Sequence, residues 1–393
     1  MMTAKAIDFA GAGPCAEAGG MGANLSDEFI ASLRARRDEF DRLGQLPHDV
    51  VETLRSLGVY RALVSRKYGG DECAPGQFLR IVERLSQGSG SVGWVASFGV
   101  SCMYLASLPP ATLAEVYAGG PDVIFAGALF PPHAAEPVAG GLKVSGRWKF
   151  GSGATGADLI GVGIKVPGAA DGGLPRMAVM PADRVRIEPN WDVIGLRGTG
   201  SHDLVVDGVV VPEDWTFVRG GTPTLDSALY RYPSMAFAAQ VLAVVGIGVA
   251  RAALDEIVQM AGGRTSITGA PTLADRAYVQ SEVAKGEAAL RSARAFFYET
   301  TEDAWATICA GDPLSTQQAA LLRLASTHVA RTGADVTRLA FTLSGTTGIY
   351  NDHALCGYVQ DAMVVAQHAF LSEGTWQNAG KVLLGMDAGP GFP

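Results

Sequence analysis

The amino-acid sequence predicts an α+β fold with a helical N-terminal domain, a middle antiparallel β domain and a C-terminal four-helix bundle. Over residues 25–120, apolar residues recur three and four positions apart, which is the spacing of amphipathic helices. Over 121–222, short runs rich in Val and Ile alternate with Gly, Pro and Asp, as strands and turns do. Over 223–393, long segments with few helix breakers predict the bundle.

Each region supports its class of element in its own way. Residues 1–24 are rich in Gly and Ala and are predicted to form a disordered leader. Pro47, followed by His48 and Asp49, fits the first turn of a helix. The middle region is too compact to contain crossover helices, which favours antiparallel strands over a parallel sheet.

The composition argues against several classes of function. Hydrophobic residues make up 48% of the chain and charged residues only 18%, so much of the surface should be hidden in a core or between subunits. The net charge of −8 argues against nucleic-acid binding. The longest apolar run, 235–250, is interrupted by Gln240 and is too short for a membrane span. With no secretory signal pattern, a cytoplasmic protein is expected.

The motifs in the chain exclude the commonest nucleotide and metal sites. The run GSGSVG at 88–93 matches a dinucleotide-binding pattern, but it follows a predicted helix, so a helix–loop–helix junction is expected there. Neither a P-loop nor the GxSxG motif of α/β-hydrolases occurs. The histidines and cysteines lack metal-ligand spacing, so no metal site is expected.

The stretch SGRWKFGSGATGAD, residues 145–158, favours a site for a flat ligand. Trp148 and Phe150 precede Ser152, which lies between two glycines. Glycines let the backbone approach a planar ligand closely, Trp148 could stack on that ligand, and the Ser152 hydroxyl could bond to its polar edge. A β-hairpin with a glycine-rich end is the alternative.

The run VVAQHAF, residues 364–370, places a histidine in a predicted buried helix. His368 follows Asp361 by seven residues, which puts both on one helix face. Such a histidine is either a core residue with satisfied hydrogen bonds or a group that donates and relays protons near neutral pH.

A predicted helix of the N-terminal domain supplies candidate substrate-binding residues. Trp94 and the segment 95–109 combine aromatic and small side chains that could line a pocket for a planar substrate, or could equally form bundle core. The candidates are Trp94, Phe98, Ser101, Cys102, Met103 and Tyr104.

Several stretches together resemble the acyl-CoA dehydrogenase superfamily over about residues 30–387. The stretches are YGG at 68–70, GLKVSGRWKFGSGATGADLIGVG at 141–163, WDVIGLRGTGSHDLVVDGVVVPEDW at 191–215, 262–290, and GTTGIYNDHALCGYVQDAMVVAQHAF at 345–370. The resemblance implies the three-part fold predicted above, usually as a tetramer, with flavin between the β domain and the bundle. It also implies flavin contacts, including an arginine–phosphate contact, at Trp148, Ser152, Trp191, Arg264, Gly345, Thr346, Thr347 and Gly348.

The spacing from Asp361 to His368 resembles the flavin-dependent monooxygenase branch of that superfamily. In that branch His368 and Ser152 would be catalytic, flanking the reactive edge of the flavin and assisting a C4a-hydroperoxide. The implied function is the oxygenase component of a two-component monooxygenase. It would take FMNH2 or FADH2 from a separate NAD(P)H-dependent reductase and use O2 to hydroxylate a small aromatic or heteroaromatic substrate.

The sequence also departs from the family pattern. Gly357 and Gln360 stand where arginines are usual, and Ile267 stands where phenylalanine is usual. The helix at 95–109 lacks the histidine of phenol hydroxylases, which favours an indolic substrate over a phenol. Many dehydrogenases carry a catalytic glutamate where this chain has Ala369. The alternatives are therefore an acyl-CoA dehydrogenase with FAD and a displaced base, and a non-catalytic helical scaffold.

Overall fold

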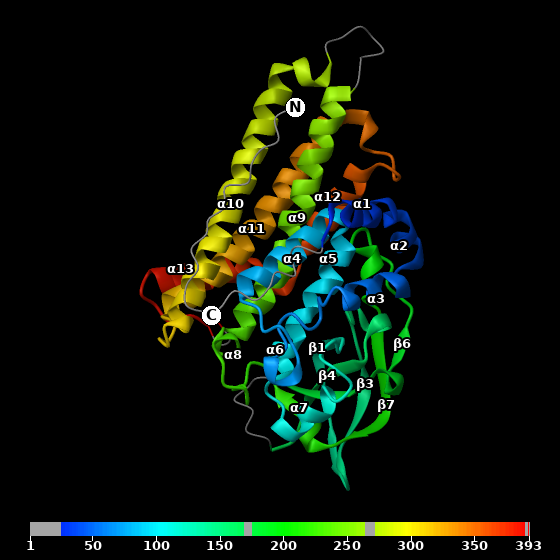
Figure 1. The fold of residues 1–393 in the computed structure, drawn as a ribbon, viewed down its shortest axis with the longest axis vertical. Coiled ribbons are helices and arrows are strands. Elements are labelled where there is room, and N and C mark those ends of the chain that lie inside the picture. Colours follow the sequence, from blue (N-terminus) through cyan, green and yellow to red (C-terminus); the bar gives the residue numbers. More distant parts are fainter. Residues whose placement is uncertain (1–24, 169–174, 264–271, 390–391, 393) are drawn as a thin grey trace.

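The structure is a computed structural model that describes residues 25–168, 175–263, 272–389 and 392. The predicted leader and Arg264 lie outside the described residues. Figure 1 shows long helices at one end of the molecule, the β domain at the other, and shorter N-terminal helices between them. The order of helices, strands and helices confirms the predicted fold class.

Short helices form the N-terminal region. The Ser26 hydroxyl caps the first helix by accepting from the N–H of Phe29, and Pro75 begins the fourth, where no hydrogen-bond donor is needed. The helices are α1 (Asp27–Ala35), α2 (Arg37–Leu43), α3 (His48–Ser56), η2 (Arg66–Tyr68), α4 (Pro75–Gly88), α5 (Gly90–Ser97), η3 (Phe98–Ser101), α6 (Cys102–Leu105) and α7 (Pro110–Val116).

The glycine-rich run at 88–93 forms the junction between α4 and α5, as expected. Ser89 caps α5 by accepting from the N–H of Val92. A Cβ atom at Gly90 would lie 2.7 Å from the Asp361 carboxylate, so glycine is needed there for close packing.

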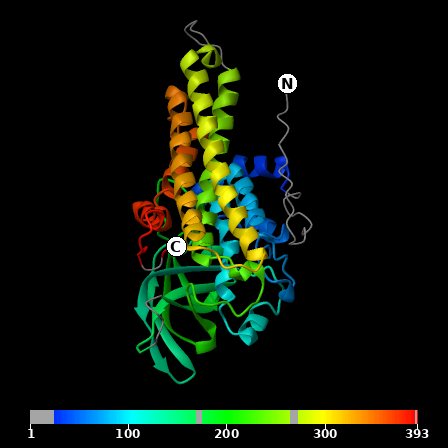
Figure 2. The ribbon, with the colours of Figure 1, turned by 90° about the vertical axis from the view of Figure 1, so that its left-hand side faces the viewer.

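Two four-stranded sheets form the middle β domain, which lies at one end of the molecule (Figure 2). Apolar side chains of both sheets form a shared core. One sheet has the order β1-β4-β5-β8 and the other the order β2-β3-β7-β6. The strands are β1 (Phe125–Ala134), β2 (Glu136–Val138), β3 (Gly141–Trp148), β4 (Leu159–Lys165), β5 (Arg176–Pro181), β6 (Arg186–Glu188), β7 (Asp203–Val211) and β8 (Thr216–Val218).

One strand pair differs from the predicted antiparallel arrangement, because β1 and β4 are parallel. The remaining pairs of described strands are antiparallel. Parallel strands need a long connection, and the prediction assumed that only a helix could supply it. Here the β2–β3 hairpin of the other sheet provides that connection.

Long helices form the C-terminal region, where α9 packs against α4, α10, α11 and α12. Figure 2 shows α9, α10 and α11 running side by side away from the β domain. The helices are α8 (Ala228–Arg231), α9 (Ser234–Gly263), η8 (Leu273–Asp275), α10 (Ala277–Cys309), α11 (Thr316–Leu343), η9 (Gly345–Thr347), α12 (Ala354–Val365), η10 (Ala369–Leu371) and α13 (Glu373–Leu383).

Helix α9 is both long and apolar. By length and composition its segment Ser234–Gly262 could cross a membrane, but 94% of its most apolar window is buried inside the protein. Burial against four helices accounts for the apolar composition of this window, because no face of the window needs to meet water.

Candidate active site

The loop after β3 carries the candidate serine. The strand ends at Trp148, and Phe150 then adopts a φ of 66°, a left-handed conformation that is rare for a bulky residue. The loop buries Ser152 but leaves 65% of Phe150 exposed, and the Phe150 ring meets Trp191 edge to face with 6.2 Å between ring centres. A strained, exposed aromatic side chain beside a buried hydroxyl indicates a ligand-binding edge.

A chain of hydrogen bonds runs from Trp94 through three hydroxyl groups. Trp94 Nε1–H donates to Ser152 Oγ at 3.2 Å. The Oγ atom of Ser201 lies 2.6 Å from that of Ser152 and 2.7 Å from Thr199 Oγ1. At the end of the chain, the Thr199 hydroxyl donates to the carbonyl oxygen of Leu196 at 2.8 Å.

The direction of this chain follows from its last member. A carbonyl oxygen only accepts, so the single proton of Thr199 is committed to Leu196. Ser201 must then donate to Thr199, and Ser152 must donate to Ser201. The Ser152 oxygen accepts from Trp94 and keeps one acceptor position for a ligand.

The peptide groups of Leu196 anchor this chain to the C-terminal helices. Leu196 has a φ of 53°, and its N–H donates to the Asp361 carboxylate at 2.6 Å. Its carbonyl oxygen also accepts from Trp191 Nε1 at 3.1 Å. Burial raises the pKa of Asp361 to about 6, against the opposing charge of Arg37. Asp361 therefore holds the loop, and no hydrogen bond to His368 is found within the described ranges.

The candidate histidine lies just beyond α12, and not inside a buried helix as predicted, because its own ring caps the turn η10. His368 Nδ1 accepts from the N–H of Phe370 at 3.2 Å. Burial lowers the pKa of His368 to about 4, and the charge of Arg323 adds to this effect. The expected near-neutral pKa is therefore wrong. The ring is neutral at pH 7, and because Nδ1 accepts, Nε2 carries the proton and is a donor.

Trp94 lies between the two candidate catalytic residues. Its ring centre is 5.8 Å from that of His368, in an edge-to-face arrangement, while its indole N–H reaches Ser152. Ser152 and His368, which are 216 positions apart in the sequence, therefore contact the same side chain. The structure thus brings the predicted pair to one place between the β domain and the bundle.

The structure corrects the interpretation of Trp148. Its side chain is fully buried between the two sheets, its Nε1–H donates to the Gly163 carbonyl oxygen at 2.8 Å, and the His133 ring packs against it at 4.8 Å. With no exposed surface it cannot stack on a ligand. Phe150 has the exposed aromatic ring instead, because its left-handed conformation turns the chain away from the strand.

The candidate substrate-binding residues follow Trp94 along α5, η3 and α6. Ser101, Cys102 and Met103 are buried, while Phe98 and Tyr104 are half-buried. The Cys102 Sγ–H donates to the Gly99 carbonyl oxygen, and burial raises the pKa of the thiol well above its usual range. Cys102 is therefore a neutral thiol and cannot act as a base.

The predicted flavin contacts at 345–348 lie in a separate segment of the chain. The segment 345–348 follows α11, with Gly345 and Thr346 exposed, Thr347 half-buried and Gly348 buried. Within the described part of the chain it makes no hydrogen bond to the loop of Ser152. A role for this segment in binding flavin stays a prediction.

Arg37 explains one departure from the family pattern. A Cβ atom at Gly357 would collide with the Arg37 guanidinium, which donates to the Ala354 carbonyl oxygen at 3.1 Å. The arginine that is usual at 357 is thus replaced in space by an arginine from α2. It acts electrostatically on Asp361, one helical turn after Gly357.

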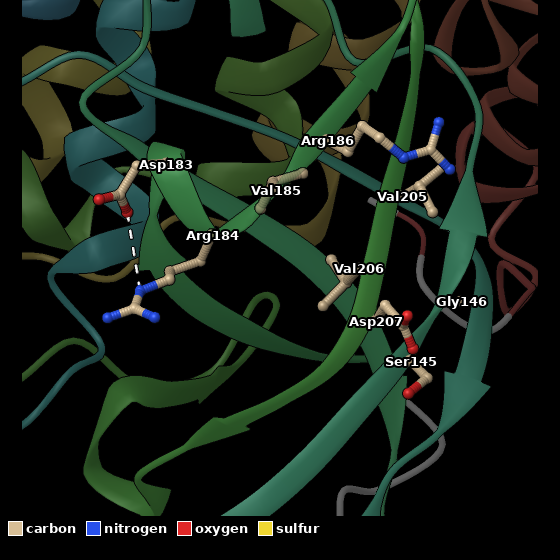
Figure 3. A pocket seen from close by; sticks show the side chains of 9 residues that line it. All are labelled: Ser145, Gly146, Asp183, Arg184, Val185, Arg186, Val205, Val206 and Asp207. Carbon is tan, nitrogen blue, oxygen red and sulfur yellow. Dashed lines mark ion pairs between the residues drawn. The ribbon is translucent and has the colours of Figure 1, made fainter.

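A surface cavity of about 510 Å³ lies on the β domain, and none of the residues that line it is a predicted site residue (Figure 3). Its lining includes Asp183, which forms an ion pair with Arg184, and the exposed Arg186. Within the described residues, no three His, Cys, Asp or Glu side chains cluster as they would around a metal ion.

Four residues of the site were not predicted. Thr199 and Ser201 alternate with glycines in RGTGS, a pattern that signals a tight turn but not a hydroxyl chain. Phe150 is named with Trp148 in the predicted flat-ligand site, but its exposed ring depends on a φ that has no sequence signature. Arg219 lies over the ring of Tyr104, and nothing in its flanking residues indicates burial.

Comparisons with known proteins agree with this architecture. Residues 25–108 match the family described as "Acyl-CoA dehydrogenase, N-terminal domain", and residues 240–373 match "Acyl-CoA dehydrogenase, C-terminal domain". In structure, the chain is similar to the HsaA monooxygenase from M. tuberculosis, with a TM-score of 0.86 and 25% identity, covering 94% of this chain and 99% of that one.

Two curated relatives identify the branch. The chain is 57% identical to an indole-3-acetate monooxygenase of Pseudomonas putida, covering 91% of this chain and 92% of the relative. It is 32% identical to the oxygenase component of an FADH(2)-dependent resorcinol hydroxylase of a Rhizobium species, covering 69% of each. These relatives are oxygenating enzymes and not dehydrogenases, which confirms the predicted enzyme class. The chain therefore belongs to the acyl-CoA dehydrogenase superfamily, in its flavin-dependent monooxygenase branch.

Proposed function

We propose that this protein is an oxygenase component that uses reduced flavin and O2 to oxygenate an indolic acid of the indole-3-acetate type. The single observation that carries this proposal is the junction at Trp94, where a buried hydroxyl chain and a neutral histidine meet. The identity of 57% with an indole-3-acetate monooxygenase supports the substrate class. The absence of a histidine from 95–109 agrees with a ring that needs no deprotonation.

The residues around Ser152 suit a reduced flavin. The exposed Phe150 ring and the half-buried Trp191 offer an aromatic edge for a planar ring system. The position left free on Ser152 is an acceptor, which matches reduced flavin, whose N5 carries a hydrogen. Oxidised flavin has a bare N5 that needs a donor. The hydroxyl chain thus favours the reduced form.

A bound reduced flavin supplies the two electrons with which O2 is activated. One oxygen atom enters the substrate and the other leaves as water. In this proposal His368 presents a fixed Nε2–H donor to oxygen atoms at the site, because Phe370 holds Nδ1. The buried side chains around Trp94 exclude water, which would otherwise favour unproductive release of H2O2.

We also propose that a separate NAD(P)H-dependent reductase supplies the reduced flavin. No nicotinamide-binding motif occurs in the chain, and relatives are named as oxygenase components or subunits. Chemically reduced FMN and FAD should each replace the reductase in vitro, which tests this point and ranks the two flavins.

A homotetramer is a further part of the proposal. Apolar side chains are exposed on this single chain near the end of α13, where Leu383, Leu384 and Met386 are 53%, 78% and 57% exposed. Contact between subunits would cover them. Light scattering at micromolar concentration should give four times the chain mass, and a monomer would contradict this part of the proposal.

The substrate is tested by anaerobic reduction of flavin, addition of protein, and mixing with O2 in the presence of one candidate substrate. We expect oxygenated product from indole-3-acetate and little from simple phenols, measured by mass spectrometry with ¹⁸O2. Conversion of phenols without conversion of indoles would overturn the proposal. Oxidation of an acyl-CoA without O2 uptake would instead favour a dehydrogenase.

A further inference from the structure

Arg219 is a buried cation without an ionic partner. It follows β8, and its side chain is only 6% exposed. Its Nη1 atom has no hydrogen-bond partner, and no carboxylate of the described residues forms an ion pair with it. Removing a guanidinium from water without a counter-charge is unfavourable, so such an arrangement indicates a site that a ligand completes.

The contact that holds Arg219 is the ring of Tyr104. The guanidinium carbon lies 3.2 Å from the ring centre, and the backbone N–H of Arg219 donates to the Pro175 carbonyl oxygen at 2.9 Å. Stacking on an aromatic ring compensates only part of the lost hydration, but it fixes the plane of the guanidinium. The hydrogen-bond donors of Arg219 are thus prearranged.

The described groups around Arg219 carry no negative charge. The groups that act electrostatically on Arg219 and Tyr104 are each other and the Cys102 thiol, with no carboxylate among them. Burial raises the pKa values of Cys102 and Tyr104, so both stay neutral at pH 7. The Arg219 charge is therefore not cancelled by its neighbours.

This cation lies along the same helical run as the candidate active site. Trp94 and Tyr104 are separated by ten residues of α5, η3 and α6, which is roughly 15 Å of helix. Trp94 contacts Ser152 and His368 at one end, Phe98 lies between, and Tyr104 carries Arg219 at the other. A planar ring beside Phe98 would extend a side-chain acid toward Arg219.

We propose that Arg219, with the Tyr104 hydroxyl, binds the carboxylate of an aromatic acid substrate. The proposal rests on the oxygenase function above and adds the residue that would select an acid over a neutral ring. A guanidinium presents paired N–H donors that match the two oxygens of a carboxylate, which a lysine cannot reproduce.

Binding to the unaltered protein gives the first test. Calorimetric titration of the reduced-flavin complex under anaerobic conditions should show indole-3-acetate binding at least tenfold more tightly than 3-methylindole or indole-3-acetamide. These two analogues keep the indole ring but lack the negative charge. Equal affinities for the three compounds would overturn the proposal.

Variants give the second test. Arg219→Met should weaken indole-3-acetate binding by roughly tenfold to a hundredfold while leaving 3-methylindole unchanged, because a charge-assisted hydrogen bond is lost. Arg219→Lys should restore part of the loss, and Tyr104→Phe, which removes only a hydroxyl, should show a smaller loss of the same kind. Arg184→Met, at an exposed arginine that lines the surface cavity of the β domain, is the matched control and should change nothing.

Folding and function are separated by two further readouts. Since Arg219→Met replaces an unpaired buried charge by an apolar chain, it should not lower the melting temperature of the ligand-free protein. It should abolish the stabilisation that indole-3-acetate gives. Turnover of 3-methylindole tests the oxygenase function by itself. If 3-methylindole is oxygenated but indole-3-acetate does not bind more tightly than 3-methylindole, the carboxylate site is refuted and the oxygenase function still stands. An equal loss of both ligands in Arg219→Met would likewise refute it.

Discussion

The indole N–H of Trp94 donates a hydrogen bond of 3.2 Å to the hydroxyl of Ser152, and so joins the N-terminal helices to the β domain. This contact starts the hydroxyl chain that ends at Leu196. It also positions the Trp94 ring against His368. The candidate active site therefore depends on contacts between all three regions of the chain.

The bond between Trp94 and Ser152 should be measurable by a double-mutant cycle. Trp94→Phe removes the donor and Ser152→Ala removes the acceptor, each at a cost of about 1 kcal/mol or more in the free energy of unfolding. The double variant should lose less than the sum of the two, as measured by urea unfolding. Trp94→Phe combined with Ser145→Ala, a serine on β3, should be additive; additivity in the first pair would contradict the bond.

His368→Ala should separate flavin oxidation from substrate oxygenation. Loss of the Nε2–H donor is expected to lower product formation by about 10²–10⁴-fold, while reduced flavin still reacts with O2 and releases H2O2. His368→Asn keeps a donor but cannot relay a proton, so it should recover only part of the coupling. The measurement is the ratio of product to H2O2 for each flavin oxidised.

His328→Ala provides the control for this variant. His328 is also half-buried between aromatic rings, those of Phe296 and Trp376, but it lies outside the site. Its removal should alter stability and leave the coupling ratio unchanged. If a folded His368→Ala protein also kept the wild-type ratio, His368 would be a core residue and nothing more.

Asp361→Asn should change how stability depends on pH. The folded protein holds the Asp361 proton up to a pH of about 6, whereas an unfolded aspartate loses it near pH 4. The carboxyl therefore contributes stability that is complete below about pH 4 and is lost as pH rises through about 6. Relative to wild type, Asp361→Asn should gain stability over this range, by about 3 kcal/mol.

At each pH the stability of the wild-type protein must be subtracted from that of Asp361→Asn, because the titration of His368 changes stability in the opposite sense in both proteins. Its lowered pKa makes the folded state lose stability as pH falls from about 6.5 to about 4. Chemical unfolding at each pH gives the difference directly. Asp352→Asn, at an exposed position, is the matched control, and a difference independent of pH would contradict the buried titration of Asp361.

Phe150 can be tested by the pair Phe150→Gly and Phe150→Ala. Both remove the exposed ring, so both should weaken reduced-flavin binding several-fold. Only alanine keeps a Cβ atom in the left-handed conformation, so the glycine variant should be more stable by about 1 kcal/mol. Thermal unfolding measures that gap. Equal stabilities would mean that the loop relaxes without strain.

The sequence was sufficient to predict the order of helices and strands. It also pointed to Ser152 and His368, the two residues that contact Trp94, as candidate site residues. Periodicity predicts helices and strands because each buried face repeats with its own period. Ser152 and His368 were identified from their neighbours and from family spacing. Their common contact with Trp94 could not be predicted, because it depends on how three regions pack together.

The errors have equally specific causes. Trp148 and Phe150 are two residues apart and would share a face if the strand continued. The strand ends at Trp148, so the two rings part. Arg37 fills the space over Gly357 from 320 positions away, and no local pattern signals such a replacement. The burial of Arg219 is also a tertiary effect.

The anchoring of Leu196 has a consequence for recombining this protein with its relatives. The segment around Leu196 takes hydrogen bonds from its own loop and gives one to Asp361 on α12, while Gly198 donates to Ser91 on α5. A chimera with a crossover inside 190–203 would join two parts of this segment from different parents, and those parts did not evolve together. Crossovers in the connections at 117–124 or 219–227 fall outside this segment. They preserve these hydrogen bonds only when α5, the segment 190–203 and α12 all come from the same parent. The three should therefore be exchanged together or not at all.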